Sequence, residues 1–412
     1  MDDAVWRALA PGSPGLRERW EEWNRAGTRL GALDRLRATH GAPVARFVSL
    51  QAELARRARG RLEVDRLPFL TSKGAEQATA AAVARHRAER FAAAGEDRVA
   101  WDACCGVGSD LLALADRLGR VVATDVDAAT LRCAAANLAY CHGPAGDRWM
   151  VARADAAALP AALPEGARTG EGLLGLFDPD RRPAGAREGR LDRWSPSLER
   201  VFEVAAELGG ACVKLPPSMS QEDLARPAGD LPLALSWISL DGDMRELSAW
   251  SGALAPGGPG REAVALRSDG TASRYAGGTR PLARSAESPQ PGQWLVELDR
   301  ALWRADLAGA FAHDLDAAAL DAPGPGGFLV ANAPVDHPMA RSWRVTAVAP
   351  GDRKRVRRML REHDVGEVTV KTRFHPEPAE QLVRSFRGGG ARRGSLAVTR
   401  IAGRTVAMLL QD

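Results

Sequence analysis

Although 45% of its residues are hydrophobic, the 412-residue sequence has no apolar run of about 18 residues, the length that a membrane-spanning helix needs. A membrane protein is therefore not expected. The N-terminal stretch MDDAVWRALA also lacks the cationic start and long apolar core of a signal peptide. We expect a soluble, cytoplasmic protein of two or three compact units, because the chain exceeds the usual size of one domain.

The sequence has only five cysteines and seven histidines, and they are scattered. Their spacing matches neither a zinc site nor a disulfide framework, and no histidine combines with serine and aspartate into a defensible catalytic triad. Metalloenzymes and triad hydrolases are therefore excluded, and no bound metal is expected.

The glycine-rich segment at residues 99–108, VAWDACCGVG, lacks the third glycine of a dinucleotide-binding fingerprint, because position 111 is leucine. That glycine brings the helix close to a pyrophosphate, so no pyrophosphate site is implied.

What the segment does have is an apolar strand that ends at Asp102, followed by a turn in which Gly106 and Gly108 let the backbone approach a ligand. Asp125 ends the next strand, where an acidic side chain can accept hydrogen bonds from both ribose hydroxyls of a nucleoside. This combination fits S-adenosylmethionine better than NAD.

Acidic residues are few toward the C-terminus. From Arg341 to Asp412 there are sixteen Lys and Arg but seven Asp and Glu, a net charge of +9 in a chain of +4, which leaves −5 for the rest. A basic tail on an acidic body favours a polyanionic partner, RNA rather than a membrane surface. A solvated basic face is the alternative, because arginine is abundant throughout the chain.

The order of predicted elements indicates an α/β fold. Residues 1–70 are expected to form a helical cap, and residues 71–95 one helix that Thr71 or Ser72 caps. Strands then alternate with helices to about residue 250, which predicts a mostly parallel sheet covered on both faces. Its strands are VAWDA, RVVATD, RWMVARAD, GLLGLFDPD and GACVKL, closed by an antiparallel hairpin of LALSWISLDGD and MRELSAWSG.

The remaining residues predict a second, smaller module. Residues 252–292 are expected to hold one strand, EAVALRS, and then a linker. A helix is predicted over 297–315, followed by the strands GGFLVAN and WRVTAVAP. The tail then alternates as helix, strand, helix, strand and strand, which predicts a compact α+β module.

Several motifs together resemble bacterial class I S-adenosylmethionine-dependent methyltransferases with a C-terminal THUMP-like domain, and the resemblance covers nearly the whole chain. They are DACCGVGSD, TDVDAATLRCAAANL, FDPDRR, VKLPP and TSKGAEQAT. The core is also similar to the trimethylguanosine synthase group. The closing hairpin is the usual feature that separates methyltransferase sheets from dehydrogenase sheets.

The resemblance implies a Rossmann-like methyltransferase sheet, S-adenosylmethionine as cofactor and three parts: a helical region over 1–70, the methyltransferase domain over 71–292 and the THUMP-like domain over 293–412. It favours a tRNA or rRNA base as substrate. Two alternatives stay open: a small-molecule methyltransferase whose tail only packs or dimerises, and a non-catalytic RNA-binding protein that retains the fold. The methylated atom and the oligomeric state are left open.

The resemblance also implies seven cofactor-binding residues. Three shape the methionine and ribose pocket, one holds the ribose hydroxyls, one caps the adenine amino group and two close over the methionine carboxylate; in that order they are Asp102, Gly106, Gly108, Asp125, Asp155, Thr71 and Gln77. A tight turn explains the glycines equally well, and helix capping explains Thr71. Asp127 is expected as a helix N-cap.

Asp178 and Pro179 end the fourth strand, where amino-group methyltransferases place a turn that accepts hydrogen bonds from the target amine. Arg181 stands where an aromatic ring would stack on the base, and Arg182 follows it. These two arginines either clamp a phosphate, stack on a base or tie down the acidic loop.

Four further side chains are candidates. Lys214 ends an apolar strand at the crevice and either orients an anionic substrate, as part of the catalytic set, or pairs with Asp178. Trp194 is either a stacking platform for the substrate or a core residue. Lys371 and Arg373 are expected to contact RNA phosphates because of their charge.

Overall fold

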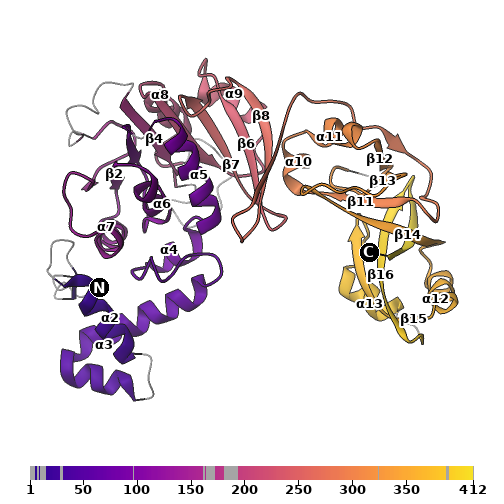
Figure 1. Ribbon diagram of the computed structural model, residues 1–412, viewed down its shortest axis with the longest axis horizontal. Coiled ribbons are helices and arrows are strands. Elements are labelled where there is room, and N and C mark those ends of the chain that lie inside the picture. The colour runs from indigo at the N-terminus through magenta and orange to yellow at the C-terminus, as the bar shows by residue number, and fades with distance from the viewer. Residues whose placement is uncertain are drawn as a thin grey trace. The chain divides into compact units, whose positions relative to one another are not determined.

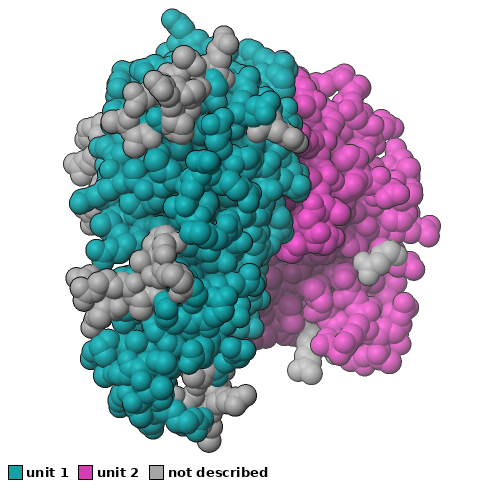
Figure 2. All heavy atoms as spheres, turned by 60° about the vertical axis from the view of Figure 1, so that its left-hand side comes forward, with its two compact units in different colours: residues 1–235, 247–259 teal, residues 236–246, 260–412 magenta. Residues whose placement is uncertain are grey.

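The computed structural model describes residues 5–6, 9, 15–27, 31–95, 97–160, 163, 172–180, 194–322, 324–386 and 389–411 (Figure 1). Its contacts divide the chain into two compact units, which Figure 2 shows in different colours. Unit 1 comprises Met1–Leu235 and Leu247–Pro259, and unit 2 comprises Ser236–Glu246 and Gly260–Asp412. In the described part of the chain, no helix has the length and apolar character needed to cross a membrane. The three-domain division stays a prediction.

A parallel sheet forms the centre of unit 1. Its strands are β1 (Val99–Asp102), β2 (Arg120–Asp125), β3 (Trp149–Arg153), β4 (Leu173–Phe177) and β5 (Gly210–Leu215). They lie in the order β3-β2-β1-β4-β5, and each neighbouring pair is parallel. Strands β1, β4 and β5 are buried along their whole length, as expected of a sheet covered on both faces. The five strands predicted from the sequence are confirmed.

The closing hairpin is also confirmed. Its strands are β6 (Ala234–Leu240) and β7 (Asp243–Gly252), and β7 pairs antiparallel with β5. Asp241 and Gly242 join them with φ angles of 53° and 86°. A two-residue turn with positive φ at both positions matches the twist of a hairpin.

Helices pack on the parallel strands. α6 (Ser109–Arg117) contacts β1 and β2, α7 (Ala128–His142) contacts β2 and β3, and α8 (Leu198–Ala206) contacts β5 and α9 (Gln221–Ala228). The carboxylate of Asp127 accepts hydrogen bonds from the backbone N–H groups of Ala129 and Thr130. Asp127 is therefore the N-cap of α7, as predicted.

The N-terminal region is helical only as far as Ala58, not to residue 70. It forms α2 (Leu16–Gly27) and α3 (Ala32–Ala58), the latter kinked at Gly41, where φ is 87°. The rings of Trp20 and Phe47 lie 5.0 and 6.4 Å from the ring of Phe69. This aromatic cluster joins the helical cap to the segment that leads to Thr71.

Two buried amide side chains hold that segment. Gln51 donates a hydrogen bond to the carbonyl of Leu70 and accepts one from its N–H, at 3.1 and 2.8 Å. Asn137, on α7, donates to the carbonyls of Phe69 and Val107 and accepts from the N–H of Phe69. The lead-in to Thr71 is thereby fixed to the glycine-rich turn that follows β1.

The prediction of one helix over 71–95 is wrong, because the segment forms α4 (Ser72–Gln77) and α5 (Ala81–Ala93). The helical structure is interrupted between them, at Thr79. Its carbonyl accepts a hydrogen bond from Ser109 Oγ at 2.7 Å, and its hydroxyl contacts Asp110 and Lys214. These contacts with distant parts of the chain override the local helix propensity.

Unit 2 contains an eight-stranded sheet in the order β10-β12-β13-β11-β14-β17-β16-β15. Its elements after the strand β14 (Ala340–Pro350) confirm the predicted order of helix, strand, helix, strand and strand. They are α12 (Arg353–Glu362), β15 (Val365–Arg373), α13 (Ala379–Phe386), β16 (Arg392–Ile401) and β17 (Arg404–Gln411).

The prediction of one helix over 297–315 is wrong. β11 (Trp294–Leu298) pairs antiparallel with β14 and with β13 (Leu329–Ala331). Two short helices follow, α10 (Arg300–Arg304) and α11 (Ala308–Asp314), separated by Asp306 in the left-handed region. Pairing with β14 draws the first residues of the segment into the sheet, and Asp299 then caps α10.

Residues 252–292 hold more strands than the single one predicted. They form β8 (Gly260–Leu266), β9 (Ala272–Ala276) and the short β10 (Arg284–Ser285). β8 and β9 are an antiparallel pair whose turn contains Gly270 at a φ of 93°. β10 pairs with β12 (Ala317–Leu320), which the sequence analysis also missed.

Candidate functional site

A cavity of about 560 Å³ lies where the parallel strands of unit 1 end. Its walls are the turn after β1, the residues that follow β2, β3 and β4, and the segment around α4. Polar groups at the carboxyl ends of parallel strands converge at one edge of a sheet, where ligands of such folds bind. Seven of the predicted site residues line this cavity: Thr71, Gln77, Gly106, Asp125, Asp155, Asp178 and Pro179.

The glycine turn is open toward the cavity. Gly106 and Gly108 have φ angles of 55° and 93°, a region that residues with a Cβ rarely adopt. A Cβ added at Gly106 would meet no atom within 4 Å, whereas one at Gly108 would touch Ala134 on α7 at 3.5 Å. Gly106 therefore borders open space, and Gly108 serves helix packing instead of lining the cavity.

Asp125 ties the second strand to this turn. Its Oδ2 accepts a hydrogen bond from the N–H of Gly106 at 3.0 Å, and its Oδ1 accepts one from the N–H of Asp127 at 2.9 Å. Burial raises the pKa of Asp125 despite these two bonds. Each carboxylate oxygen has a second lone pair, so the side chain can still accept from a ligand.

Asp102 ends β1 but does not line the cavity. Its side chain is only 2% exposed, and its Oδ2 has no hydrogen-bond partner among the described residues. Burial, reinforced by the neighbouring Asp110, raises the pKa of Asp102 well above its usual range.

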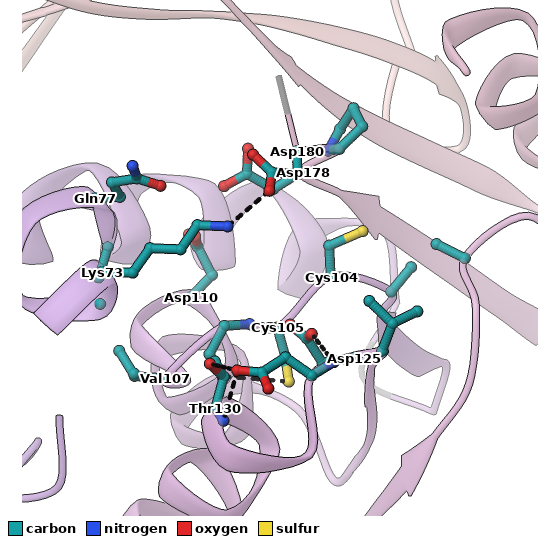
Figure 3. A pocket seen from close by; sticks show the side chains of 18 of the residues that line it. Lys73, Gln77, Cys104, Cys105, Val107, Asp110, Asp125, Thr130, Asp178 and Asp180 are labelled. Atoms are coloured by element: carbon teal, nitrogen blue, oxygen red, sulfur yellow. Dashed lines mark hydrogen bonds and ion pairs between the residues drawn. The ribbon is translucent and has the colours of Figure 1, made fainter. Parts of the chain in front are cut away.

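The cavity is strongly acidic. Among the described residues that line it, seven carry a carboxylate and one, Lys73, carries a positive charge. Lys73 extends from α4 to Asp180, with its Nζ 2.7 Å from Oδ2 (Figure 3). The segment TSKGAEQAT predicts no role for Lys73, because all but one of the carboxylates that line the cavity with it come from distant parts of the chain.

A buried cluster of charges continues behind the cavity wall. Lys214 is 9% exposed, and its Nζ lies 2.5 Å from Asp178, 3.2 Å from Asp110 and 2.6 Å from the hydroxyl of Thr79. The predicted pairing of Lys214 with Asp178 is confirmed. Asp110 also pairs with Arg87, on α5. Burial opposes the charge on Asp110, but Arg87 and Lys214 outweigh it and lower its pKa.

Sequence reasoning missed three members of this cluster, namely Thr79, Arg87 and Asp110. The one available signal was Lys214 itself, since a lysine within an apolar strand requires a buried acidic partner. The exposed Val126 was missed as well. It lines the cavity between Asp125 and Asp127 and is 56% exposed.

Other predicted site residues lie elsewhere. Trp194 is 6% exposed and does not line the cavity, although its neighbours Ser195 and Pro196 do. Arg181 and Arg182 lie outside the described residues. In the described ranges no group of three acidic, cysteine or histidine side chains is placed to hold a metal ion.

Lys371 and Arg373 belong to unit 2 and are engaged within it. The Nζ of Lys371 lies 4.2 Å from the centre of the Trp343 ring, a cation–π contact. Arg373 forms an ion pair with Glu297, and its guanidinium lies 5.6 Å from the centre of the Phe328 ring. Both side chains would have to give up these contacts in order to bind phosphate.

The fold and the cavity together define a Rossmann-like class I methyltransferase. Two proteins of Mycobacterium tuberculosis, from strains CDC 1551 and H37Rv, are each named an uncharacterized S-adenosylmethionine-dependent methyltransferase. Each is 30% identical to this chain over 338 residues, which are 81% of this chain and 85% of the relative. The chain therefore belongs to the S-adenosylmethionine-dependent methyltransferases, and S-adenosylmethionine is its cofactor.

Two further comparisons extend this result. Residues 340–412 match a family described as THUMP domain-like, so the enzyme carries a THUMP-like domain at its C-terminus. A solved structure from Porphyromonas gingivalis W83, named provisionally as a methyltransferase, covers 100% of this chain and 99% of its own, with a TM-score of 0.69 and 15% identity. That likeness shows the same fold over the whole chain.

The cavity fits this cofactor chemically. The sulfonium and ammonium groups of S-adenosylmethionine are cationic, and seven carboxylates line the cavity. The exposed Val126 offers an apolar surface of the kind that a purine ring requires.

Proposed function

We propose that this enzyme methylates RNA, and that the basic helix α12 of its THUMP-like domain holds the RNA backbone. The observation that carries the proposal is the composition of α12, whose ten residues include six Lys or Arg and one Glu. Its buried side chains are Val356, Met359 and Leu360, and all six cations are exposed. The helix therefore packs by one apolar stripe and presents positive charge over the rest of its surface.

The charges on α12 are only weakly neutralised. Arg353, Arg355 and Arg358 lie 3.5 to 3.7 Å from acidic oxygens, in exposed pairs that contribute little to stability. Lys354 and Arg361 have no acidic partner among the described residues. Closely spaced, exposed cations of this kind bind nucleic acid by releasing counterions from phosphates. They are better placed for this role than Lys371 and Arg373, which are already engaged.

For the cofactor we propose the following roles in unit 1. S-adenosylmethionine, when bound, supplies an electrophilic methyl group. Asp125 accepts hydrogen bonds from the ribose hydroxyls, Asp155 accepts one from the adenine amino group, and the backbone at Gly106 borders the ribose. Thr71 and Gln77 contact the methionine carboxylate, with Lys73 close by.

For the acceptor we propose that Asp178 and the carbonyl of Pro179 accept hydrogen bonds from a base nitrogen and align it for in-line attack. That nitrogen loses a proton on methylation, which passes to Asp178 or to solvent. Lys214 holds the Asp178 carboxylate in place from behind. The acidic lining disfavours a phosphate at this position, which agrees with a base as the reacting group.

Asp125→Ala is expected to weaken S-adenosylmethionine binding by about 2 kcal/mol, or roughly 30-fold, because hydrogen bonds to a charged group are lost. Isothermal titration calorimetry on the folded variant measures this directly. Unchanged affinity would remove Asp125 from the cofactor site.

Combined Lys354→Ala, Arg358→Ala and Arg361→Ala substitutions should weaken RNA binding. Three lost phosphate contacts would flatten the plot of log affinity against log salt by about two units, while cofactor affinity stays unchanged. Filter binding of total tRNA across a salt series tests this. Arg37→Ala, Arg117→Ala and Arg226→Ala, on unit 1, remove the same total charge and serve as the matched control. An equal loss in both triple variants would argue against a dedicated role of α12.

The substrate class is tested by mass spectrometry of nucleosides from a strain that lacks the gene. One methylated nucleoside should be absent from tRNA or rRNA and return on complementation. If every methylated nucleoside persists, a small-molecule acceptor becomes the better explanation.

A further inference from the structure

The buried charges form a continuous chain from α5 to the cavity. Arg87 is 1% exposed and pairs with Oδ1 of Asp110. The Oδ2 of Asp110 lies 3.2 Å from Lys214 Nζ, which lies 2.5 Å from Oδ2 of Asp178. Of these four charged side chains, Asp110 and Asp178 line the cavity. Arg87 is thus connected to Asp178 through two intervening side chains, those of Asp110 and Lys214.

We propose that Arg87 is a positioning residue for methyl transfer, which acts through Asp110 and Lys214 to fix the Asp178 carboxylate at the acceptor side of the cavity. This inference rests on the role proposed above for Asp178.

Charge balance explains why Arg87 is needed. Among the described residues, Lys214 forms ion pairs with both Asp110 and Asp178, which compete for the same ammonium group. Arg87 binds the other oxygen of Asp110 and neutralises part of its charge. The Nζ of Lys214 lies closer to Asp178 than to Asp110, at 2.5 against 3.2 Å. Without the guanidinium, Asp110 would attract Lys214 more strongly and loosen its hold on Asp178.

Stability alone is a poor explanation of this arrangement. Replacing a buried ion cluster with apolar side chains of similar volume is often neutral or stabilising. This cluster also does not end in the core, because Asp178 is the one member whose side chain is substantially exposed. A buried cluster whose one exposed member, Asp178, lies at a cavity is suited to orienting the carboxylate of that residue.

The test compares two cofactor analogues in the full-length protein. Sinefungin carries an amine where S-adenosylmethionine carries its methyl group, so its affinity reports on a carboxylate at the acceptor side, whereas S-adenosylhomocysteine carries nothing there. Titration calorimetry of Arg87→Met should show sinefungin binding weakened about tenfold, the loss expected for one charge-assisted hydrogen bond, and S-adenosylhomocysteine binding changed less than about twofold. Arg87→Lys should recover part of the loss.

The controls separate positioning from folding. Arg90→Met alters the same helix, where Arg90 donates to the Leu254 carbonyl at 2.7 Å and lies over the Trp250 ring, and it should leave both affinities unchanged. If Arg87→Met does not fold, Thr79→Val removes the hydroxyl that Lys214 contacts and should likewise weaken sinefungin alone. Equal losses for both analogues, or no loss for sinefungin, would overturn the inference.

Asp178→Ala distinguishes failure of the inference about Arg87 from failure of the proposed function. Weakened sinefungin binding in Asp178→Ala with none in the folded Arg87 or Thr79 variants would overturn only the role of Arg87. If Asp178→Ala itself leaves sinefungin unaffected, the role proposed for Asp178 fails, and the inference fails with it.

Discussion

Asn137→Leu is expected to destabilise the protein by about 3 to 6 kcal/mol, a large part of the stability of a typical domain. Asn137 is fully buried on α7 and binds three backbone groups: the N–H and carbonyl of Phe69 and the carbonyl of Val107. Leucine has a similar volume but binds none of them, and three unsatisfied buried groups at about 1 to 2 kcal/mol each account for the expected loss. Urea unfolding followed by circular dichroism measures the change.

The same bonds connect the segment before Thr71 to the turn that carries Gly106, so loss of stability should be accompanied by weaker cofactor binding. Asn332→Leu is the matched control, because Asn332 is exposed and accepts one hydrogen bond, from Gln293. It should change stability by less than about 0.5 kcal/mol. A similarly small effect at Asn137 would mean that these backbone groups find other partners.

Asp178→Ala is expected to lower the rate of methyl transfer to RNA about 100-fold or more, a typical contribution of a group that orients an acceptor and takes its proton. Affinity for S-adenosylmethionine should change little, since Asp178 is assigned to the acceptor. Single-turnover rates together with calorimetry separate the two quantities. Parallel losses of rate and affinity would instead indicate a structural or cofactor-binding role.

The sequence was informative where chemistry is encoded locally. Asp125 ends β2, Asp178 directly follows β4 and Asp155 lies two residues beyond the end of β3. The parallel arrangement of these strands with β1 brings all three side chains to one cavity without further information. Asp127 was likewise predicted correctly, because an N-cap depends only on the residues beside it.

The sequence was uninformative where distant residues decide the structure. Thr79 interrupts a predicted helix because it contacts Ser109 and Lys214, which lie 30 and 135 positions away. Arg87 lies on a helix with other arginines, and nothing in the spacing reveals that this one is buried against Asp110. The last two residues of the strand Trp294–Leu298 were predicted as the start of a helix, because the pairing partner β14 comes some 40 residues later in the chain.

Transfer of a tritium-labelled methyl group from S-adenosylmethionine to RNA tests the account most directly. Purified enzyme is incubated with total RNA from a strain lacking the gene, and label is counted in the RNA and small-molecule fractions. The account predicts label in RNA, strongly reduced in Asp178→Ala and in the α12 triple variant. Label confined to the small-molecule fraction, or none despite confirmed cofactor binding, would contradict it.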